Sequence, residues 1–232
     1  MRQLLKNMML AFSVSVVPAC LNAQSSPTAP AMNFNAFIQQ NVKMTQSEME
    51  GPLAVGNNLI IAGDYIVSAQ NVGTFTYGGL PVSLVVNGAV QFNSGNSFKV
   101  NMDGYAKIAN CGTSKVWYQN QNNAYSPIRI TPNNDYNSSP RIDFSQNAEN
   151  WGVSEIVNPI CEPSGIDFAS AFTQLKNTAL SLSNCTDNTL LTTSNGTPLG
   201  RTNLPSQVKI HLQSGANILN ITGAELNNID IL

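Results

Sequence analysis

Charged side chains are scarce in this 232-residue chain, because Asp, Glu, Lys and Arg together make up only 10% of it, against ~25% in an average soluble domain. The formal net charge of −2 leaves no basic field that would attract nucleic acid or an anionic lipid surface. We therefore expect no nucleic acid among its partners. Neutral Asn, Gln, Ser and Thr carry the solubility instead, and these residues favour turns over helix faces.

Groups that usually carry catalysis or bind metals are also few. The chain has a single histidine, His211, and alternation within 207–212 places it on the solvated face of a strand. No Cys-x-x-Cys pair indicates a transition-metal site, and no serine lies in a nucleophile elbow. The carboxylates are scattered, and the Asn/Asp turns at 133–135 and 103–104 lack calcium-loop spacing. These absences predict a protein that is not an enzyme and that needs no cofactor or metal.

Long hydrophobic runs are missing after the first residues. Residues 1–23 have the pattern of a secretory signal peptide, with a basic start, an apolar core over 8–17 and a small-residue cleavage site after Ala23. No later run reaches the 18 or more apolar residues that a membrane-spanning helix needs. We expect a secreted or cell-surface-associated chain without a transmembrane segment in its mature form.

Cysteine is rare as well, and three residues follow the expected cleavage site: Cys111, Cys161 and Cys185. Export permits a disulfide, but an odd number leaves one cysteine over or pairs it between chains. The sequence does not choose among the pairings, and buried free thiols are an equal alternative.

What the chain does contain, after a Ser/Pro/Thr-rich tether at 24–32, is a series of short apolar runs separated by corners. The runs cover 53–61, 83–92, 97–100 and 105–108. The corners are Gly56-Asn57, Gly63-Asp64, Gly78-Gly79, Asn87-Gly88, Ser94-Gly95-Asn96 and Asp103-Gly104. The runs are rich in β-branched and aromatic residues, and Gly and Asn provide the left-handed positions of sharp turns. This pattern predicts a mainly β domain over 33–232, a β-solenoid or β-helix of short strands, with a β-sandwich as the alternative.

One helix is expected over 166–182. Its apolar residues recur at steps of three and four and form a single stripe made of Phe168, Phe172, Leu175, Ala179 and Leu182. Ser164 and Asp167 together resemble a capping box at its start. A helix with one apolar face must bury that face, so we expect it to pack along the β run.

Between 113 and 164 the sequence turns polar and rich in asparagine, which indicates longer excursions from the scaffold. Four aromatic residues in this stretch are candidates for a binding surface: Trp117, Tyr118, Tyr125 and Tyr136. The alternative interpretation is that each ring folds back as a local anchor. Further strands are expected at 189–192, 207–212 and 216–222, with the chain stopping inside another strand.

Three segments together resemble the choice-of-anchor A family, an adhesive domain of secreted and cell-surface proteins. They are Phe34–Phe37 with 50–59, Leu84–Gly88 with 92–95, and 166–171 with 217–223, so that the likeness covers 33–232. Asn57 and Asn87 replace the second glycine of the family pattern, which Asn tolerates. Family members commonly continue further, so we expect a shortened form or a fragment.

The resemblance implies a β-solenoid-like domain with a helix packed along it, a role in surface attachment, and no catalytic residues. The leading hypothesis is therefore a non-enzymatic adhesion or matrix module that binds an extracellular glycan, a matrix protein or a surface. A β-helix carbohydrate-active enzyme is the first alternative and needs acidic residues that converge on one face. An ice- or crystal-surface-binding protein is the second and needs ranked Thr or Ser on a flat face.

Overall fold

A computed structural model describes residues 26–202, 204–215 and 217–230, so the expected signal peptide at 1–23 lies outside the described residues. The chain divides into two compact units, Pro27–Lys176 and a second that contains Asn177–Leu232. Among the described helices, none is both long and apolar enough to cross a membrane.

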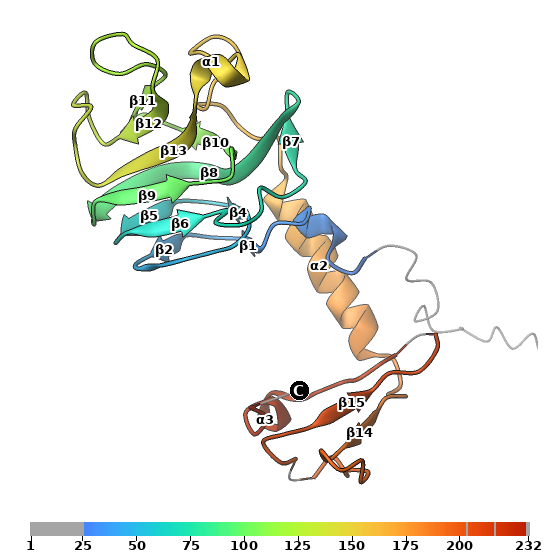
Figure 1. Cartoon of the computed structure of the whole chain (residues 1–232). Helices are drawn as coiled ribbons and strands as arrows, with labels where there is room; N and C mark the ends of the chain where they lie inside the picture. The colour runs from blue at the N-terminus through green and yellow to red at the C-terminus, as the bar shows by residue number, and fades with distance from the viewer. Residues whose placement is uncertain (1–25, 203, 216, 231–232) are drawn as a thin grey trace, which may run out of the picture. The chain divides into compact units, whose positions relative to one another are not determined.

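The first unit is mainly β, as the short apolar runs predicted (Figure 1). Its strands are β1 (Ala36–Ile38), β2 (Val42–Met44), β3 (Ser47–Glu48), β4 (Leu53–Val55), β5 (Leu59–Ala62), β6 (Tyr65–Val67), β7 (Thr76–Tyr77), β8 (Leu80–Ser94), β9 (Ser97–Val100), β10 (Tyr105–Asn110), β11 (Lys115–Trp117), β12 (Pro127–Thr131) and β13 (Arg141–Asn147). Its helical segments are the 3-10 turn η2 (Ala29–Ala31), α1 (Ala148–Trp151) and the first part of α2 (Phe168–Ser183).

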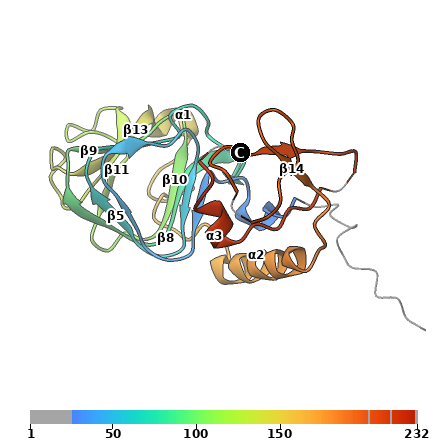
Figure 2. The ribbon, with the colours of Figure 1, turned by 90° about the horizontal axis from the view of Figure 1, so that it is seen from below.

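Three parallel ladders organise these strands. The first joins β1, β4, β8 and β10, the second joins β2, β5 and β8, and the third joins β3, β6, β9 and β13. Each of the first three passes of the chain thus adds one rung to each ladder, and the next pass adds β10 to the first ladder and β13 to the third. Antiparallel strands β12 and β11 extend the third ladder. Figure 2 shows the strands of this unit arranged around a common interior, as a nearly closed sheet.

The core lies inside the ladders, where every second side chain points inward. Leu53, Leu59, Ile61, Phe98 and Ile142 are all 0% exposed. In the first ladder the outward side chains are buried too, because other segments cover that side: Ala54 and Val85 are no more than 1% exposed. Burial of this apolar surface is the main favourable term for the unit.

Corners hold successive passes at close distance. A Cβ atom at Gly63 would lie 1.9 Å from the carbonyl oxygen of Thr45, so only glycine fits there. The next residue, Asp64, accepts hydrogen bonds from the backbone N–H groups of Asn96 and Ser97, at 2.5 and 3.1 Å. These bonds, that of Asn96 first, lower the pKa of the Asp64 carboxyl. The Gly63-Asp64 corner is therefore confirmed.

The corner expected at Asn87-Gly88 does not interrupt the strand, and this prediction was wrong. Strand β8 runs through it from Leu80 to Ser94. It pairs with β4 up to Val86 and with β5 from Val90, so one strand serves two ladders. Backbone bonding is kept across the change of partner, because Gly88 N–H donates to the Asn57 carbonyl at 3.0 Å.

Helix α2 confirms the expected helix, and its first turns pack on the first unit. The Phe168 ring stacks on Phe37 with centroids 4.8 Å apart, and Phe172 does so at 5.3 Å. The helix is capped by Asp167, whose Oδ1 accepts from Ser170 N–H at 2.9 Å. The predicted capping box is wrong, because the Ser164 hydroxyl accepts from Ile166 instead.

Only the first part of the apolar stripe of α2 is buried. Phe168 is buried and Phe172 and Leu175 are half-buried, but Ala179 and Leu182 are exposed. The expectation of one continuous buried face was therefore wrong for the second half of the helix. That half belongs to the second compact unit.

The second unit is small. It contains the antiparallel pair β14 (Leu190–Thr192) and β15 (Lys209–His211), helix α3 (Gly223–Leu226), and a core of Leu191, Leu204 and Val208. As predicted, His211 is exposed on a strand, and its Nε2 lies 2.8 Å from the Thr192 hydroxyl.

The strand expected at 216–222 is wrong over its described residues. Backbone groups there bond to side chains instead of to a neighbouring strand: Ile218 N–H donates to Asn188 and Asn220 N–H to Asp187. Thr222 then starts α3 as the first member of a capping box with Glu225. Side chains 30 and 33 positions away in the sequence therefore take the backbone donors that strand pairing would use.

An ion pair in this unit predicts acid sensitivity. Hydrogen bonds from Arg201, and then from Thr222, lower the pKa of Glu225 from 4.5 to about 2. A carboxyl whose folded pKa is depressed stabilises the fold above its unfolded pKa and loses that contribution as it is protonated. We therefore expect amide protection in the second unit to fall between pH 4.5 and 2, and hydrogen exchange resolved by residue measures it.

Arg201→Gln is the control, because it removes the partner and should abolish most of this pH dependence. Fluorescence would not serve, since both tryptophans and all six tyrosines lie in the first unit. Equal pH profiles for the wild type and Arg201→Gln would contradict the assignment.

Candidate binding site: an aromatic depression beside β11

An open depression of about 820 Å³ lies beside strand β11 in the first unit. Its lining comes from β11 and the loop that follows it, from α1, and from the segment after α1: Lys115, Val116, Trp117, Tyr118, Gln119, Asn120, Gln121, Asn123, Tyr125, Ala148, Glu149, Gly152, Val153, Ser154, Glu155 and Ile156. A volume of this size is within the range of small-ligand sites.

The structure brings together three of the four aromatic residues proposed from the sequence. Trp117, Tyr118 and Tyr125 line the depression, whereas Tyr136 does not. The Tyr136 ring lies over the Arg129 guanidinium, with 4.2 Å from Cζ to the ring centroid, and meets Trp117 edge-on at 5.6 Å. Tyr136 is thus a local anchor that supports Trp117 from the neighbouring loop.

Trp117 is held firmly by the sheet. It belongs to β11, opposite Arg129 in the register, and its Nε1–H donates to the Thr131 hydroxyl at 2.8 Å. Because its N–H group is already bonded, Trp117 offers the depression part of its ring and no free donor.

We call residues 152–161 the wall, because 152–156 line the depression. Tyr118, which also lines the depression, is bonded to the far end of this wall. Its hydroxyl accepts the backbone N–H of Ile160 at 2.9 Å. Burial raises the pKa of Tyr118, so the hydroxyl stays protonated at neutral pH. This bond fixes the wall at its far end.

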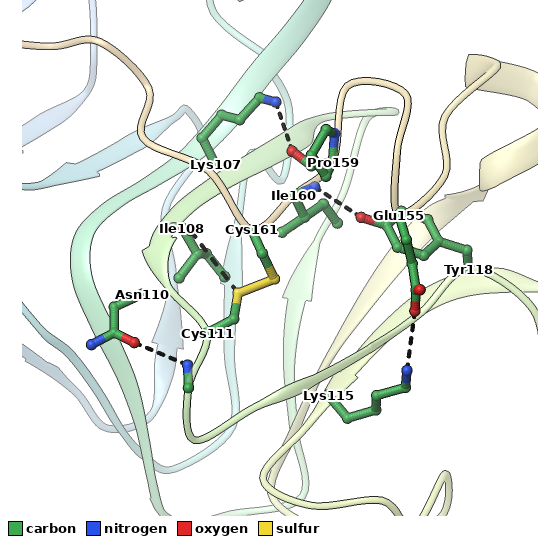
Figure 3. The surroundings of a disulfide bond; sticks show 11 residues. Lys107, Ile108, Asn110, Cys111, Lys115, Tyr118, Glu155, Pro159, Ile160 and Cys161 are labelled. Atoms are coloured by element: carbon green, nitrogen blue, oxygen red, sulfur yellow. Dashed lines mark hydrogen bonds and ion pairs between the residues drawn. A yellow bond between two sulfur atoms is a disulfide. The ribbon is translucent and has the colours of Figure 1, made fainter.

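A disulfide and a hydrogen bond from the Lys107 side chain fix the same segment (Figure 3), and a backbone hydrogen bond from Ile108 fixes it as well. Cys111, which ends the β10 region, is bonded to Cys161 across 50 positions of sequence. Ile108 N–H donates to the Ile160 carbonyl at 2.9 Å, and the Lys107 ammonium donates to the Pro159 carbonyl at 2.7 Å. The wall is therefore stapled to strand β10 at adjacent residues.

Lys107 is unusual because its side chain is fully buried. It forms an ion pair with Glu162, and its ammonium lies 3.9 Å from the centroid of the Tyr77 ring. Burial is the largest influence on Lys107 and lowers its pKa, while Glu162 acts in the opposite direction. These contacts give Lys107 a structural role beneath the wall.

The rim carries two exposed apolar side chains. Tyr125 is 61% exposed, and Ile156 is 89% exposed. A turn holds Ile156 outward, because the Ser154 hydroxyl accepts the N–H groups of Ile156 and Val157, at 3.3 and 3.1 Å. Such a preordered rim lowers the entropy cost of binding.

The charges of the depression are sparse and slightly negative. Lys115 pairs with Glu155 at 3.1 Å, and both side chains are largely exposed, 40% and 68%. Glu149 adds a second carboxylate on α1. One cation against two carboxylates leaves an excess of one negative charge. Within the part of the chain that the structure describes, no group of three or more His, Cys, Asp or Glu side chains could hold a metal ion.

Sequence reasoning missed several lining residues, including Gln119, Gln121, Asn123 and Glu149. The first three lie in the polar stretch that was interpreted only as an excursion, and amide-rich turns carry no pattern that separates a site from a turn. Glu149 became part of the site only through the position of α1.

A family model described as "Putative Ice-binding-like adhesive domain" matches residues 27–232. No curated protein and no solved structure matches the chain.

Proposed function

We propose that this chain, which belongs to the ice-binding-like adhesive domain family, is a secreted or surface-associated adhesion module without catalytic activity. It would hold an extracellular glycan, matrix protein or surface at the depression beside β11. The observation that carries this proposal is the exposed rim formed by Tyr125 and Ile156, beside a wall that the Cys111–Cys161 disulfide holds in place. The proposal includes the narrower kinship with choice-of-anchor A domains suggested by the sequence.

The scaffold suits such a role. We interpret the three parallel ladders as the faces of a β-solenoid, with α2 packed on the first face through Phe168 and Phe172. In this architecture every rung adds to a continuous core. A rigid core lets the loops at β11 and α1 present a fixed surface.

The carbohydrate-active enzyme remains the alternative from a different class, because Glu149 and Glu155 both line the depression. A general acid needs an environment that keeps its proton near neutral pH, usually burial in an apolar pocket. Both carboxylates are exposed, and Glu155 faces Lys115. Release of reducing ends from polysaccharides, lost in Glu149→Gln, would favour the enzyme.

An ice or crystal surface fits less well, although the family description mentions ice. The outward residues of the third ladder include Lys99, Asp143 and Arg129, which are opposite one another in the register. Those of the second ladder include Lys43 and Ile60. These described columns carry charges and an aliphatic side chain instead of ranked Thr or Ser.

Tyr125→Ala tests the proposed site. The mature chain from Gln24 is first screened on a glycan and matrix-protein array, and each ligand found is then titrated. Because rigid, exposed aromatic residues often dominate binding energy, we expect affinity to fall ~30-fold, the equivalent of ~2 kcal/mol.

Met102→Ala is the matched control, because Met102 is 52% exposed in the same unit but does not line the depression. It should leave affinity unchanged, and both variants should melt like the wild type. Equal affinity of Tyr125→Ala and the wild type for every ligand found would place the adhesive surface elsewhere.

A further inference from the structure

Three side-chain amides that line the depression are left without a hydrogen-bond partner among the residues that the structure describes. Gln119, Gln121 and Asn123 all line it, and their amide groups form no hydrogen bond with any residue that the structure describes. Their neighbour Asn120 differs, since its Oδ1 accepts from Asn122 and Ala124 and so holds the turn. The loop is therefore ordered by one amide and presents three others.

A carboxamide donates and accepts at the same time, which matches a ligand that is dense in hydroxyl groups. Each hydroxyl of a sugar likewise needs both a donor and an acceptor. A peptide backbone would instead seek an extended strand edge or a deep apolar pocket for its side chains. The depression does border an edge strand, β11, but that strand spans only Lys115–Trp117, and the depression is open instead of deep.

Tyr125 supplies the apolar element that such a ligand requires. Its ring makes no ring contact within the described residues and is 61% exposed, and its hydroxyl has no bonded partner there. The ring can cover the C–H face of a pyranose while the amides bond to its edge. Trp117 cannot do this with its full face, because Tyr136 and Thr131 engage it.

Charge decides which sugars fit. The excess of one negative charge in the depression opposes a carboxylated or sulfated chain. Glu149 forms no ion pair within the described residues and would attract an amine. We infer that the site takes a neutral or amine-bearing glycan chain, stacked on Tyr125 and hydrogen-bonded by Gln119, Gln121 and Asn123; the inference rests on the proposed adhesive function.

The test titrates the mature chain, by calorimetry, with three soluble probes: a neutral β-glucan oligomer, a chitosan oligomer and an oligogalacturonate. We expect binding of the first two and none of the third. Gln121→Met keeps the side-chain length and removes the amide, and Asn123→Gly keeps the left-handed backbone at φ 59°. Each variant should bind the neutral oligomer with ~3–10-fold lower affinity, as expected for one lost hydrogen bond.

Glu149→Gln separates the two accepted classes. It should weaken binding of the chitosan oligomer ~3-fold or more at low salt, with an effect that fades as salt is added, whereas any effect on the neutral oligomer should not depend on salt. Binding of the oligogalacturonate alone, or neutral binding that is indifferent to both amide variants, would overturn the inference.

The same experiment distinguishes failure of the inference from failure of the proposed function. A matrix protein or surface that binds through Tyr125, while no oligosaccharide binds, overturns the glycan and leaves the adhesion module standing. Absence of binding to every sugar, protein and surface offered overturns both.

Discussion

Phe168→Asp is expected to unfold the first unit. Phe168 is 5% exposed, and its ring stacks on Phe37 at 4.8 Å, where α2 covers the first ladder. Loss of a buried phenylalanine costs ~3–5 kcal/mol, and a carboxylate in the same place adds a desolvation penalty. The sum approaches the 5–15 kcal/mol that a whole domain typically has.

Fluorescence measures this result directly, because Trp117 and Trp151 both lie in the first unit. The variant should give the emission of an unfolded chain without denaturant. Leu180→Asp is the control on the same helix. Because Leu180 is 64% exposed, this variant should melt like the wild type. A folded Phe168→Asp protein would mean that α2 is not needed to cover the ladder.

Replacement of Cys111 and Cys161 by serine is expected to lower the free energy of unfolding by ~2–4 kcal/mol. The bond joins residues 50 positions apart, so its loss frees a long loop in the unfolded chain. At roughly 2–4 °C per kcal/mol for a unit of this size, the melting temperature should fall by about 5–15 °C.

A second double variant with alanine controls for the new hydroxyl groups. If the bond itself is responsible, the two variants should agree within ~0.5 kcal/mol. The loss should also weaken ligand binding, because the bond staples the wall that carries Glu155 and Ile156. A melting temperature equal to that of the wild type would show that Lys107 and Tyr118 hold the wall by themselves.

More of the scaffold than of the site could be predicted from the sequence. Alternating apolar residues and the Gly63-Asp64 corner indicated short strands, and the period of the helix identified α2 nearly to the residue. Asn87-Gly88 misled, because the same dipeptide can bend a strand without ending it when hydrogen bonding continues on both sides. The strand predicted over 217–222 was wrong, because a pattern of apolar residues does not indicate hydrogen bonds between side chains and the backbone.

Among the candidate residues, Trp117, Tyr118 and Tyr125 do share one depression, whereas Tyr136 supports it from outside. Nothing in the pattern distinguished these two roles, because both belong to an aromatic residue in a polar stretch. The buried Lys107 was not anticipated at all, since lysine in a strand usually faces solvent.

By itself, the sequence determined that the chain is mainly β, that most of its turns fall at Gly and Asn, and that it contains one amphipathic helix that packs on the strands. These properties follow from local conformational preference and the period of apolar residues, which neighbours in the chain set. Only the tertiary structure decided that Cys111 pairs with Cys161, that Lys107 lies under a wall, and which amides are left unbonded around Tyr125. Those outcomes depend on groups tens of residues apart, which become neighbours only when successive passes of the chain stack.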